Sequence, residues 1–509
     1  MNIYMAQFIN SLGFITDKTS TKWQRRSIFI GMLILADAVL CYIVIKHVPY
    51  TEIDWVAYMQ EVEGWLGGET NYEKLKGDTG PLVYPAFFLY LYSGIRWLTD
   101  EGRNIRVGQW LFGLIYLINL GVVLAMYEVY AYEDESCNDD APPAIATNDK
   151  GCLRAIVDEE VEVDIKKLPI GSASLRKRSV RPKHRSRSRR SRLAPRAQET
   201  EANVADKSRM LCTSASDATG FNSVPWWGCV LLVLSKRVHS IFMLRMFNDT
   251  IAAFLGYVAI LLFMQRKLRV GCFVYSLGVG TKMNLLLFAP GVLLVLLLAA
   301  GWRESLLCLS ICAATQLAIG YPFLSTYPLQ YLKKAFELSR VFMYKWTVNF
   351  KFLEESVFLS KGLSVALLLL TLGGMVTMYI KWLSENSAAA RDKGRGPSYL
   401  HSLLQHGLQH DLSPRFVVVT IFTSNFIGIA FSRTIHYQFY CWYYHMLPLL
   451  LWHCRFPSWL VVCICLCVEV AYNVYPATAW SSLLLQAAHL SILVGLWTAP
   501  APRIWKSKL

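Results

Sequence analysis

Charged residues are scarce in this chain. Asp, Glu, Lys and Arg make up only 17% of its 509 residues, whereas 54% are hydrophobic. A water-soluble domain usually carries roughly 25% charged residues, so the shortage excludes an ordinary soluble protein of this length. The charges that remain are mostly basic, 51 against 36 acidic, and give a formal net charge of +15. The composition therefore predicts an integral membrane protein.

Three further features are missing, and each absence excludes a class of protein. No small-residue cleavage site follows the first apolar segment, so we expect no cleavable signal peptide. The 13 cysteines predict no disulfide framework and no metal site, because cysteines two residues apart, such as Cys463, Cys465 and Cys467, face different sides of a helix. No internal repeat is visible, which argues against a transporter built from repeated halves.

Apolar segments recur along most of the chain. A segment of about 20 apolar residues is long enough to cross a bilayer as a helix. Lys22, Arg25 and Arg26 precede the first segment, so the positive-inside rule places the N-terminus in the cytosol. Applied to the later basic clusters, the rule predicts an all-α polytopic protein of about 12 spans with both termini cytosolic. The clearest segments are residues 27–45, 106–128, 251–265, 284–300, 305–323, 358–380, 415–432 and 480–498.

Polar interruptions divide the chain into parts. Loops as long as the two predicted lumenal ones are usually functional or disordered, and in the first of them we expect residues 82–98 to form a helix packed at the membrane. The parts are a cytosolic N-terminus (1–26), the first spans (27–130) with a lumenal loop (47–104), a charged cytosolic insertion (131–224), the remaining bundle (225–500) with a lumenal loop (324–356), and a basic cytosolic tail (501–509).

The insertion at 131–224 differs in character from the rest of the chain. An acidic half is followed by a basic run, residues 176–196, that is interleaved with serines. Blocks of like charge with few apolar residues are typical of disordered segments. An Arg-Ser-rich run can bind RNA, but on a membrane protein we favour a solvated cytosolic insertion and expect no nucleic-acid partner.

Candidate catalytic residues begin at the lumenal end of the first span. Glu52 and Asp54 stand two residues apart, at a membrane boundary where a carboxylate is costly to desolvate. Either could be a general base that takes a proton from an attacking sugar hydroxyl, or a helix cap in a wet loop. Asp78 follows in the Gly-Pro turn of residues 76–85, where it could hold an acceptor hydroxyl or stabilise the turn.

Two later membrane boundaries carry further polar residues. Asn248 and Asp249 lead directly into an apolar helix, which either could cap, and Asp249 could equally belong to an active site. Lys282 interrupts a long apolar stretch, and its ammonium group needs a partner there, such as a lipid phosphate.

Cations also gather at positions predicted to be lumenal. Arg340 lies in the loop at 324–356, beside aromatic residues, and lumenal cations run against the positive-inside bias. Arg433, His436 and Gln438 accompany an aromatic run whose tyrosines and tryptophans an interfacial belt explains, although the belt does not explain these three. Carboxylates and cations on one face suit transfer from a lipid phosphate to a hydroxyl, because cations stabilise the departing phosphate.

Several of these motifs together resemble one enzyme family, the dolichyl-phosphate-mannose-dependent mannosyltransferases of asparagine-linked glycosylation, of the GT-C superfamily, and in particular the alpha-1,3-mannosyltransferases. The resemblance covers about 27–130 and 224–500, in order, and the charged insertion has no counterpart in it. The motifs are residues 50–55 (YTEIDW), 77–85 (GDTGPLVYP), 237–242 (RVHSIF), 247–249 (FND), 282–284 (KMN), 346–349 (WTVN), 423–433 (TSNFIGIAFSR) and 436–439 (HYQF).

The resemblance implies a fold and a reaction. The fold is a GT-C membrane bundle whose lumenal loops carry short interfacial helices, set in the endoplasmic reticulum membrane with a lumenal active site. The reaction moves mannose from dolichyl phosphate mannose to the Man5GlcNAc2 glycan on dolichyl pyrophosphate and gives Man6GlcNAc2. A beta-linked donor and an alpha-linked product imply inversion in a single displacement. No metal and no cofactor are expected.

The resemblance also suggests roles for individual residues. Asp54 is implied as the general base ahead of Glu52. The alternatives are a mannosyltransferase of glycosylphosphatidylinositol assembly, which would carry an Asp-x-Asp pair in place of Glu52-x-Asp54, and more remotely a transporter of lipid-linked sugars. The implied substrate-binding residues are Asp78 and Asp249 for the acceptor, Lys282, Arg340 and Arg433 for the donor phosphate, His436 and Gln438 near the sugar, and Tyr84, Trp346 and Asn349 from the shared motifs.

Overall fold

The computed structural model describes residues 21–139, 224–336, 343–392, 407 and 412–505, with backbone only at 21–24, 132–139 and 391–392. Almost all of these residues belong to one compact unit. Most of the predicted insertion lies outside the described residues, so its predicted disorder stays a prediction.

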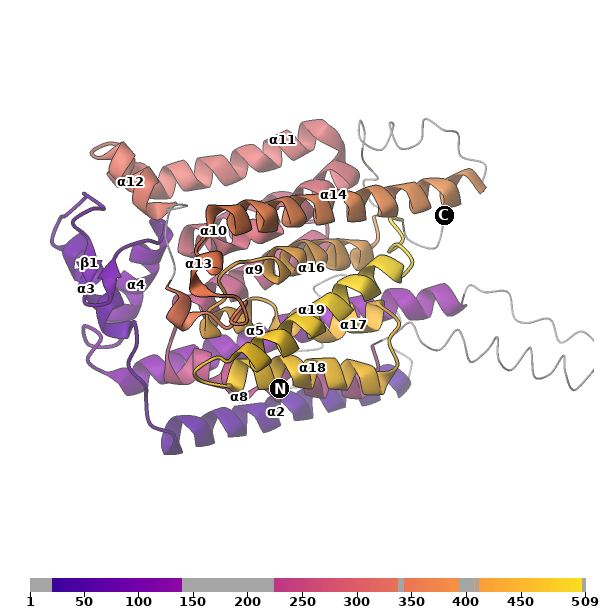
Figure 1. The fold of residues 1–509 in the computed structure, drawn as a ribbon, viewed down its shortest axis with the longest axis horizontal. Coiled ribbons are helices and arrows are strands. Elements are labelled where there is room, and N and C mark those ends of the chain that lie inside the picture. The colour runs from indigo at the N-terminus through magenta and orange to yellow at the C-terminus, as the bar shows by residue number, and fades with distance from the viewer. Residues whose placement is uncertain (1–20, 140–223, 337–342, 393–406, 408–411, 506–509) are drawn as a thin grey trace, which may run out of the picture. The chain divides into compact units, whose positions relative to one another are not determined.

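The described chain is helical apart from one short antiparallel hairpin (Figure 1). In the first half the elements are α2 (Thr21–His47), α3 (Trp55–Leu66), β1 (Lys76–Gly77), β2 (Gly80–Pro81), α4 (Phe87–Leu98), α5 (Ile105–Asp139), η1 (Trp226–Leu232), α8 (Lys236–His239), η2 (Ser240–Leu244), α9 (Asn248–Met264), α10 (Leu268–Thr281) and η3 (Met283–Phe288). In the second half they are α11 (Ala289–Leu324), α12 (Pro328–Ala335), η4 (Tyr344–Trp346), α13 (Glu355–Phe358), α14 (Lys361–Asp392), α16 (Pro414–Ala430), η5 (Tyr437–Trp442), η6 (Tyr444–Met446), α17 (Leu447–His453), α18 (Ser458–Asn473) and α19 (Ala479–Thr498).

Several helices are long and apolar enough to cross a membrane. Within the described residues there are five, or six if the pair η1 and α8–η2, bent by 49°, counts as one broken span. The five are Arg25–His47, Ile105–Ala131, Met283–Leu324, Lys361–Ala390 and Ala479–Thr498, and four shorter apolar helices are Asn248–Met264, Leu268–Thr281, Pro414–Ala430 and Ser458–Asn473. The prediction of a helical, multi-pass membrane protein is confirmed.

One of these spans is broken in its middle. Helix α11 contains Gly301 at φ 71° and ψ 177°, which is not a helical conformation. A straight helix of its 36 residues would be about 54 Å long, far more than the roughly 30 Å of a bilayer core. The break falls between the two spans predicted at 284–300 and 305–323. Next to it, Glu304 accepts from Arg269 Nε at 2.6 Å and so ties the break to the start of α10.

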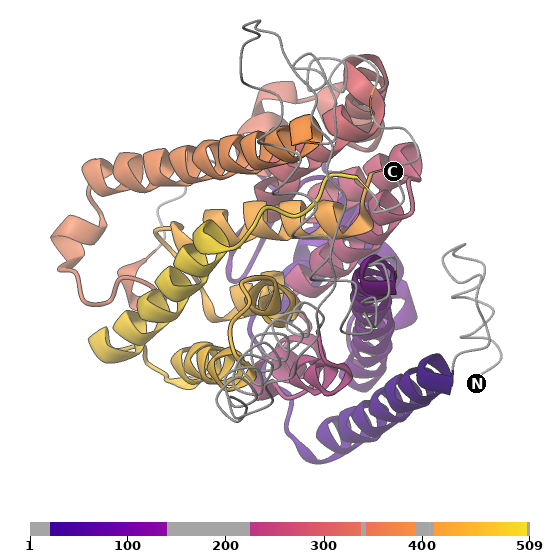
Figure 2. The same cartoon turned by 90° about the vertical axis from the view of Figure 1, so that its right-hand side faces the viewer.

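The two least buried of these spans carry exposed apolar side chains. Figure 2 shows α2 and α14 at opposite edges of the bundle, and only 28% and 17% of their apolar windows are buried. Side chains such as Leu369 and Ile380 on α14 are more than half exposed. Because such surfaces are stable in lipid rather than in water, both helices suit the membrane-facing edge of a bundle.

The segments predicted as lumenal loops pack together at one end of the helices. α3, α4, the hairpin and α12 gather at the left of Figure 1, and they share one apolar cluster. Tyr72, from the first loop, has its ring centroid 4.8 Å from that of Phe323 and 4.9 Å from that of Tyr331. The predicted helix at 82–98 begins five residues late, at Phe87, because Pro85 disfavours a helical conformation in the residue before it.

Candidate active site

The two carboxylates before α3 have different partners. Glu52 Oε1 accepts the backbone N–H of Val56 at 3.2 Å, and Glu52 Oε2 accepts the hydroxyl of Tyr50. Asp54 occupies the N-cap position of α3, yet its side chain makes no capping hydrogen bond. Instead, Asp54 Oδ2 accepts the hydroxyl of Tyr58 at 3.4 Å. The local structural role therefore belongs to Glu52, and the half-buried Asp54 carboxylate is turned toward Tyr58.

The start of α9 supplies two buried polar side chains. The N-cap of this helix is Phe247, which has no side-chain cap, so neither Asn248 nor Asp249 has the capping role that was one interpretation of the sequence. Both side chains are fully buried. Asp249 Oδ1 accepts the indole N–H of Trp442 at 2.7 Å. Burial at this depth requires partners for both oxygens of the carboxylate.

Lys282 provides the second partner of Asp249. It follows the last turn of α10 in an extended conformation, and its Nζ lies 2.7 Å from Asp249 Oδ2. The same ammonium group donates to Asn248 Oδ1 at 3.0 Å and lies 5.3 Å from the centre of the Tyr84 ring. The sequence predicted that this ammonium group needs a partner, and the structure provides one within the protein.

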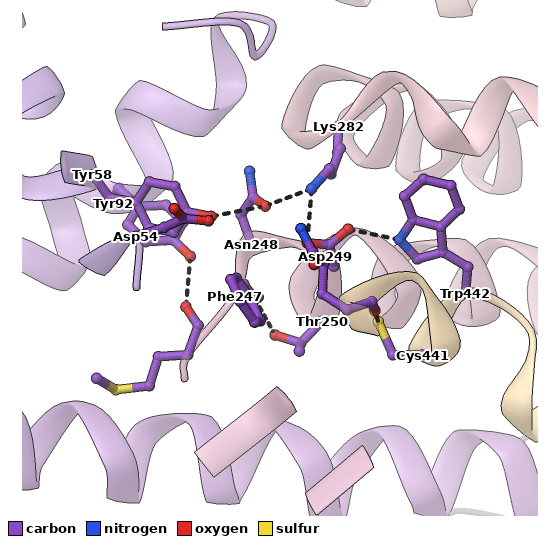
Figure 3. Close-up of polar contacts among 12 residues, drawn as sticks. Asp54, Tyr58, Tyr92, Phe247, Asn248, Asp249, Thr250, Lys282, Cys441 and Trp442 are labelled. Atoms are coloured by element: carbon purple, nitrogen blue, oxygen red, sulfur yellow. Dashed lines mark hydrogen bonds and ion pairs between the residues drawn. The ribbon is translucent and has the colours of Figure 1, made fainter. Parts of the chain in front are cut away.

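These contacts join four separate parts of the chain into one polar cluster (Figure 3). Its centre is Asn248 Oδ1, which accepts from Lys282 and, at 3.3 Å, from the hydroxyl of Tyr58. In sequence order the members of this cluster, called the polar cluster below, are Asp54, Tyr58, Asn248, Asp249, Lys282 and Trp442. Two carboxylates and one ammonium group thus lie at the end of the bundle where the loop segments pack.

Sequence reasoning did not single out Tyr58 and Trp442. Tyr58 stands four residues after Asp54, so the two share a face of α3, and this spacing was the available signal. Trp442 belongs to the aromatic run that was explained as a belt. Its contact with Asp249 joins residues 193 apart in the chain, so no local pattern could reveal it.

The tyrosines near Asp54 keep their protons. Burial raises the pKa of Tyr58 well above its usual value, and the negative charge of Asp54 adds to the effect. Burial raises the pKa of Tyr84 as well, with a further contribution from Asp54. Both side chains are therefore hydrogen-bond donors at any physiological pH.

Three other predicted residues lie on the hairpin and at η5. Asp78 is exposed in the turn of the hairpin, where its backbone N–H donates to Gln60 Oε1 at 2.7 Å. His436 packs edge-on against Phe439 with centroids 5.2 Å apart, and Phe439 stacks on Trp442 at 3.8 Å. Gln438 is half-buried beside them. His436 is thus linked to the polar cluster through aromatic rings.

A second group of predicted residues has structural partners. Asn349 Nδ2 donates to the carbonyl of Ser432 at 2.7 Å, and its Oδ1 accepts from Gln486 on α19. Arg433 Nη1 donates to Ser364 Oγ, near the start of α14, at 2.7 Å. These contacts fix the segments that precede η5 against the surrounding helices.

Two predicted residues remain. Trp346 lies in η4, where the ammonium group of Lys345 is 4.8 Å from its ring centroid. Arg340 falls at 337–342, outside the described residues, so its predicted contact with the donor phosphate stays a prediction.

Among the described residues, one group of side chains has the residue types and spacing of a metal site. This group lies outside the polar cluster. Asp37, Cys41 and His239 are buried with their ligand atoms within 4.8 Å of one another. His239 Nε2 lies 2.8 Å from Asp37 Oδ1, and Nδ1 lies 2.8 Å from the carbonyl of Ser235. Both ring nitrogens therefore have protein partners, and the pair joins α2 to α8.

Comparison with known proteins identifies the family. The model of the family described as ALG3 protein matches residues 31–135 and 210–482. The Arabidopsis thaliana protein named Dol-P-Man:Man(5)GlcNAc(2)-PP-Dol alpha-1,3-mannosyltransferase is 39% identical over 480 residues, which are 93% of this chain and 88% of that protein. The Homo sapiens and Neurospora crassa proteins of the same name are 35% and 33% identical, over 94% and 96% of this chain and 91% of each relative.

No solved structure matches the chain. The matching family model and the relatives confirm the resemblance that the sequence motifs indicated. Because the family model covers more than half of the chain, and the relatives match it along nearly its whole length, the chain belongs to the ALG3 protein family.

Proposed function

We propose that this chain is a dolichyl-phosphate-mannose-dependent mannosyltransferase that adds mannose in alpha-1,3 linkage to Man5GlcNAc2 on dolichyl pyrophosphate. The observation that carries the proposal is the set of relatives with this name, 33–39% identical over more than nine-tenths of the chain. Their names do not favour the alternative acceptor of glycosylphosphatidylinositol assembly. The polar cluster supplies the chemistry that the reaction needs.

Asp54 is the general base in this proposal. Asp249 is fully buried, and both of its oxygens are engaged, by Lys282 and by Trp442. Glu52 is engaged in capping α3. Asp54 stands at the edge of the polar cluster and is part-exposed, so it is the carboxylate that a sugar hydroxyl can reach. Taking the hydroxyl proton as the new bond forms is ordinary general base catalysis.

Cations act on the leaving group. The bond between the anomeric carbon of mannose and the phosphate oxygen breaks as the acceptor oxygen attacks from the opposite face, so negative charge develops on the phosphate. Lys282 is the cation of the polar cluster, and Arg340 and Arg433 remain candidates in the later segments. Cations held in place beforehand stabilise such charge without reorganisation. We propose that the reaction needs no metal.

We also propose the GT-C type of bundle, with about 12 spans and a lumenal active site in the endoplasmic reticulum membrane. Support for the larger count comes from the break in α11 at Gly301 and from the four shorter apolar helices, since each could be one further pass. Support for a single catalytic face comes from the two loop segments, which pack together at one end of the bundle.

The test is mannose transfer by the purified full-length protein in detergent with EDTA present. Dolichyl phosphate mannose and lipid-linked Man5GlcNAc2 are the substrates, and wild type is compared with Asp54→Asn and Glu52→Gln. We expect wild type to form Man6GlcNAc2 and Asp54→Asn to lose roughly 10²–10⁴-fold in rate, the usual contribution of a general base. Glu52→Gln should stay within several-fold of wild type.

Other results would change the proposal in defined ways. Near-normal transfer by Asp54→Asn would reject the base, and loss in Glu52→Gln alone would move the role to Glu52. Transfer that stops in EDTA and returns with a divalent cation would reject the metal-independent reaction. If wild type accepted only a glycosylphosphatidylinositol precursor, the proposed acceptor, Man5GlcNAc2 on dolichyl pyrophosphate, would be wrong.

A further inference from the structure

The hydroxyl of Tyr58 lies between two acceptors. Its oxygen is 3.4 Å from Asp54 Oδ2 and 3.3 Å from Asn248 Oδ1. A carboxylate oxygen and an amide oxygen both accept, whereas a phenol has one proton to donate. Both distances exceed the usual 2.7–2.8 Å of an O–H···O bond. This is the geometry of one hydroxyl that two acceptors share, each at nearly the same distance.

The neighbours of Tyr58 hold its hydroxyl oxygen in place. The side chain is 2% exposed, and its ring packs edge-on against Tyr84, Phe88 and Tyr92 with centroids 5.9, 5.3 and 5.1 Å away. The position of the oxygen is therefore fixed. Rotation of the O–H about its own C–O bond is enough to redirect the proton from one acceptor to the other.

The amide oxygen of Asn248 does not depend on Tyr58 for a hydrogen-bond donor. Its Oδ1 also accepts from Lys282 Nζ at 3.0 Å, and that ammonium group is held by Asp249 at 2.7 Å. When Tyr58 donates to Asp54, Asn248 keeps a donor. When Tyr58 turns to Asn248, the amide oxygen accepts two hydrogen bonds, one for each lone pair.

We propose that Tyr58 is a positioning residue for Asp54, which donates to the ionised carboxylate before the reaction and turns to Asn248 as the carboxylate takes up the acceptor proton. This inference rests on the proposed function. In the step, the acceptor O–H bond breaks and its proton goes to Asp54. A bond forms between the acceptor oxygen and the anomeric carbon, and the bond from that carbon to the phosphate oxygen breaks. Asp54 then carries the proton and no longer needs a donor.

The consequence is measurable as a change in the titration of Asp54. A hydrogen bond donated to a carboxylate stabilises its charged form and lowers its pKa. Tyr58→Phe removes that donor and keeps the ring. Tyr92→Phe is the matched control, because Tyr92 packs in the same aromatic group and its hydroxyl donates to the carbonyl of Met246 at 3.4 Å instead.

The experiment has two readouts on the full-length protein in detergent. One is the pH profile of kcat/KM for mannose transfer. The other needs no activity: the pH dependence with which a water-soluble carbodiimide and an amine nucleophile label Asp54, followed by peptide mass spectrometry. In Tyr58→Phe we expect the acid limb and the labelling midpoint to move to higher pH by about one unit, and the plateau rate to fall roughly tenfold. In Tyr92→Phe neither midpoint should move.

The two readouts separate this inference from the proposed function. An unchanged labelling midpoint in Tyr58→Phe, with a thermal midpoint like that of Tyr92→Phe, would show that Tyr58 only packs and would overturn the inference. Equal shifts in both variants would overturn it too. A shifted labelling midpoint in Tyr58→Phe, with no Man6 product from wild type, would uphold the hydrogen bond while rejecting the proposed reaction.

Discussion

Lys282 and Asp249 form an ion pair that is almost wholly removed from solvent. Their side chains are 13% and 0% exposed, and the charged atoms are 2.7 Å apart. Trp442 and Asn248 supply further hydrogen bonds, so that both charges are solvated by the protein. A buried pair of this kind contributes little net stability, but the removal of one partner alone typically costs about 3–5 kcal/mol.

This asymmetry gives a prediction that separates folding from function. Lys282→Met should lower the thermal midpoint strongly, because Asp249 is left as a buried charge without its cation. The double variant Lys282→Met with Asp249→Asn should recover most of that loss, since neither buried charge remains. Thermal unfolding in detergent measures the effect. Mannose transfer should stay low in both variants if Lys282 acts on the donor phosphate.

One result would contradict a role of Lys282 at the donor phosphate. Recovery of transfer together with stability in the double variant would show that Lys282 serves only to neutralise Asp249. Asp249→Asn alone is the matched control, because the ammonium group of Lys282 keeps its bond to Asn248.

Some residues of the polar cluster can be predicted from the sequence as site residues, and others cannot. Asp54, Asp249 and Lys282 stand out because charge is rare beside apolar spans, and rarity itself points to function. Tyr58 and Trp442 are hidden among many aromatic residues, and only the packed structure shows which of them meet a carboxylate. The partners of Asn349 and Arg433 depend on the same long-range packing.

At the scale of elements, α3 is held in place by the hairpin. Gly77 of β1 packs so closely that a Cβ atom there would lie 2.5–2.7 Å from the Cα, Cβ and carbonyl oxygen of Ala57. Ala57 is the neighbour of Tyr58 in the chain, so the hairpin packs against the turn of α3 that carries Asp54 and Tyr58. A two-residue strand has no periodic pattern, which explains why the sequence predicted a turn here and no strands.

Gly77→Ala should therefore disturb the site through the backbone. The added methyl group meets main-chain atoms that cannot move aside, and overpacking of this kind costs about 1–3 kcal/mol. We expect mannose transfer to fall at least tenfold and the thermal midpoint to drop. Gly94→Ala in α4 is the control, because a Cβ there has no neighbour within 4 Å. A helical alanine in that place should leave activity unchanged and stability equal or slightly higher.

Gly77→Ala and Gly94→Ala together test whether the hairpin supports α3. If Gly77→Ala retained both full activity and full stability, the hairpin would not be the support of α3. If Gly94→Ala were as damaging as Gly77→Ala, the losses would reflect a general intolerance of this region rather than the contact with Ala57.

At the scale of the whole molecule, the apolar pattern predicted the helical membrane fold class, whereas the predicted number of spans stays a prediction. Long helices such as α5 and α19 coincide with predicted segments because a bilayer demands a continuous apolar run. The shorter helices, such as α10 and α18, have 14 and 16 residues, fewer than the roughly 20 that a straight span needs. Length alone therefore cannot decide which of them cross.

Most of the charged insertion lies outside the match to the family model. The family model matches 31–135 and resumes at 210, which leaves out most of the segment predicted as an insertion. Every member of the polar cluster lies outside this segment.

Replacement of residues 140–223 by a flexible Gly-Ser linker of about 20 residues, which has a mean reach of roughly 25 Å, should therefore preserve the enzyme. We expect Man6GlcNAc2 formation within about twofold of wild type and an unchanged thermal midpoint, since catalysis depends on the bundle and its loop segments. A same-length linker variant that also carries Asp54→Asn is the control for background transfer. Complete loss of transfer by a folded linker variant would contradict this prediction and would assign the insertion a part in the activity, which is what an RNA-dependent function requires.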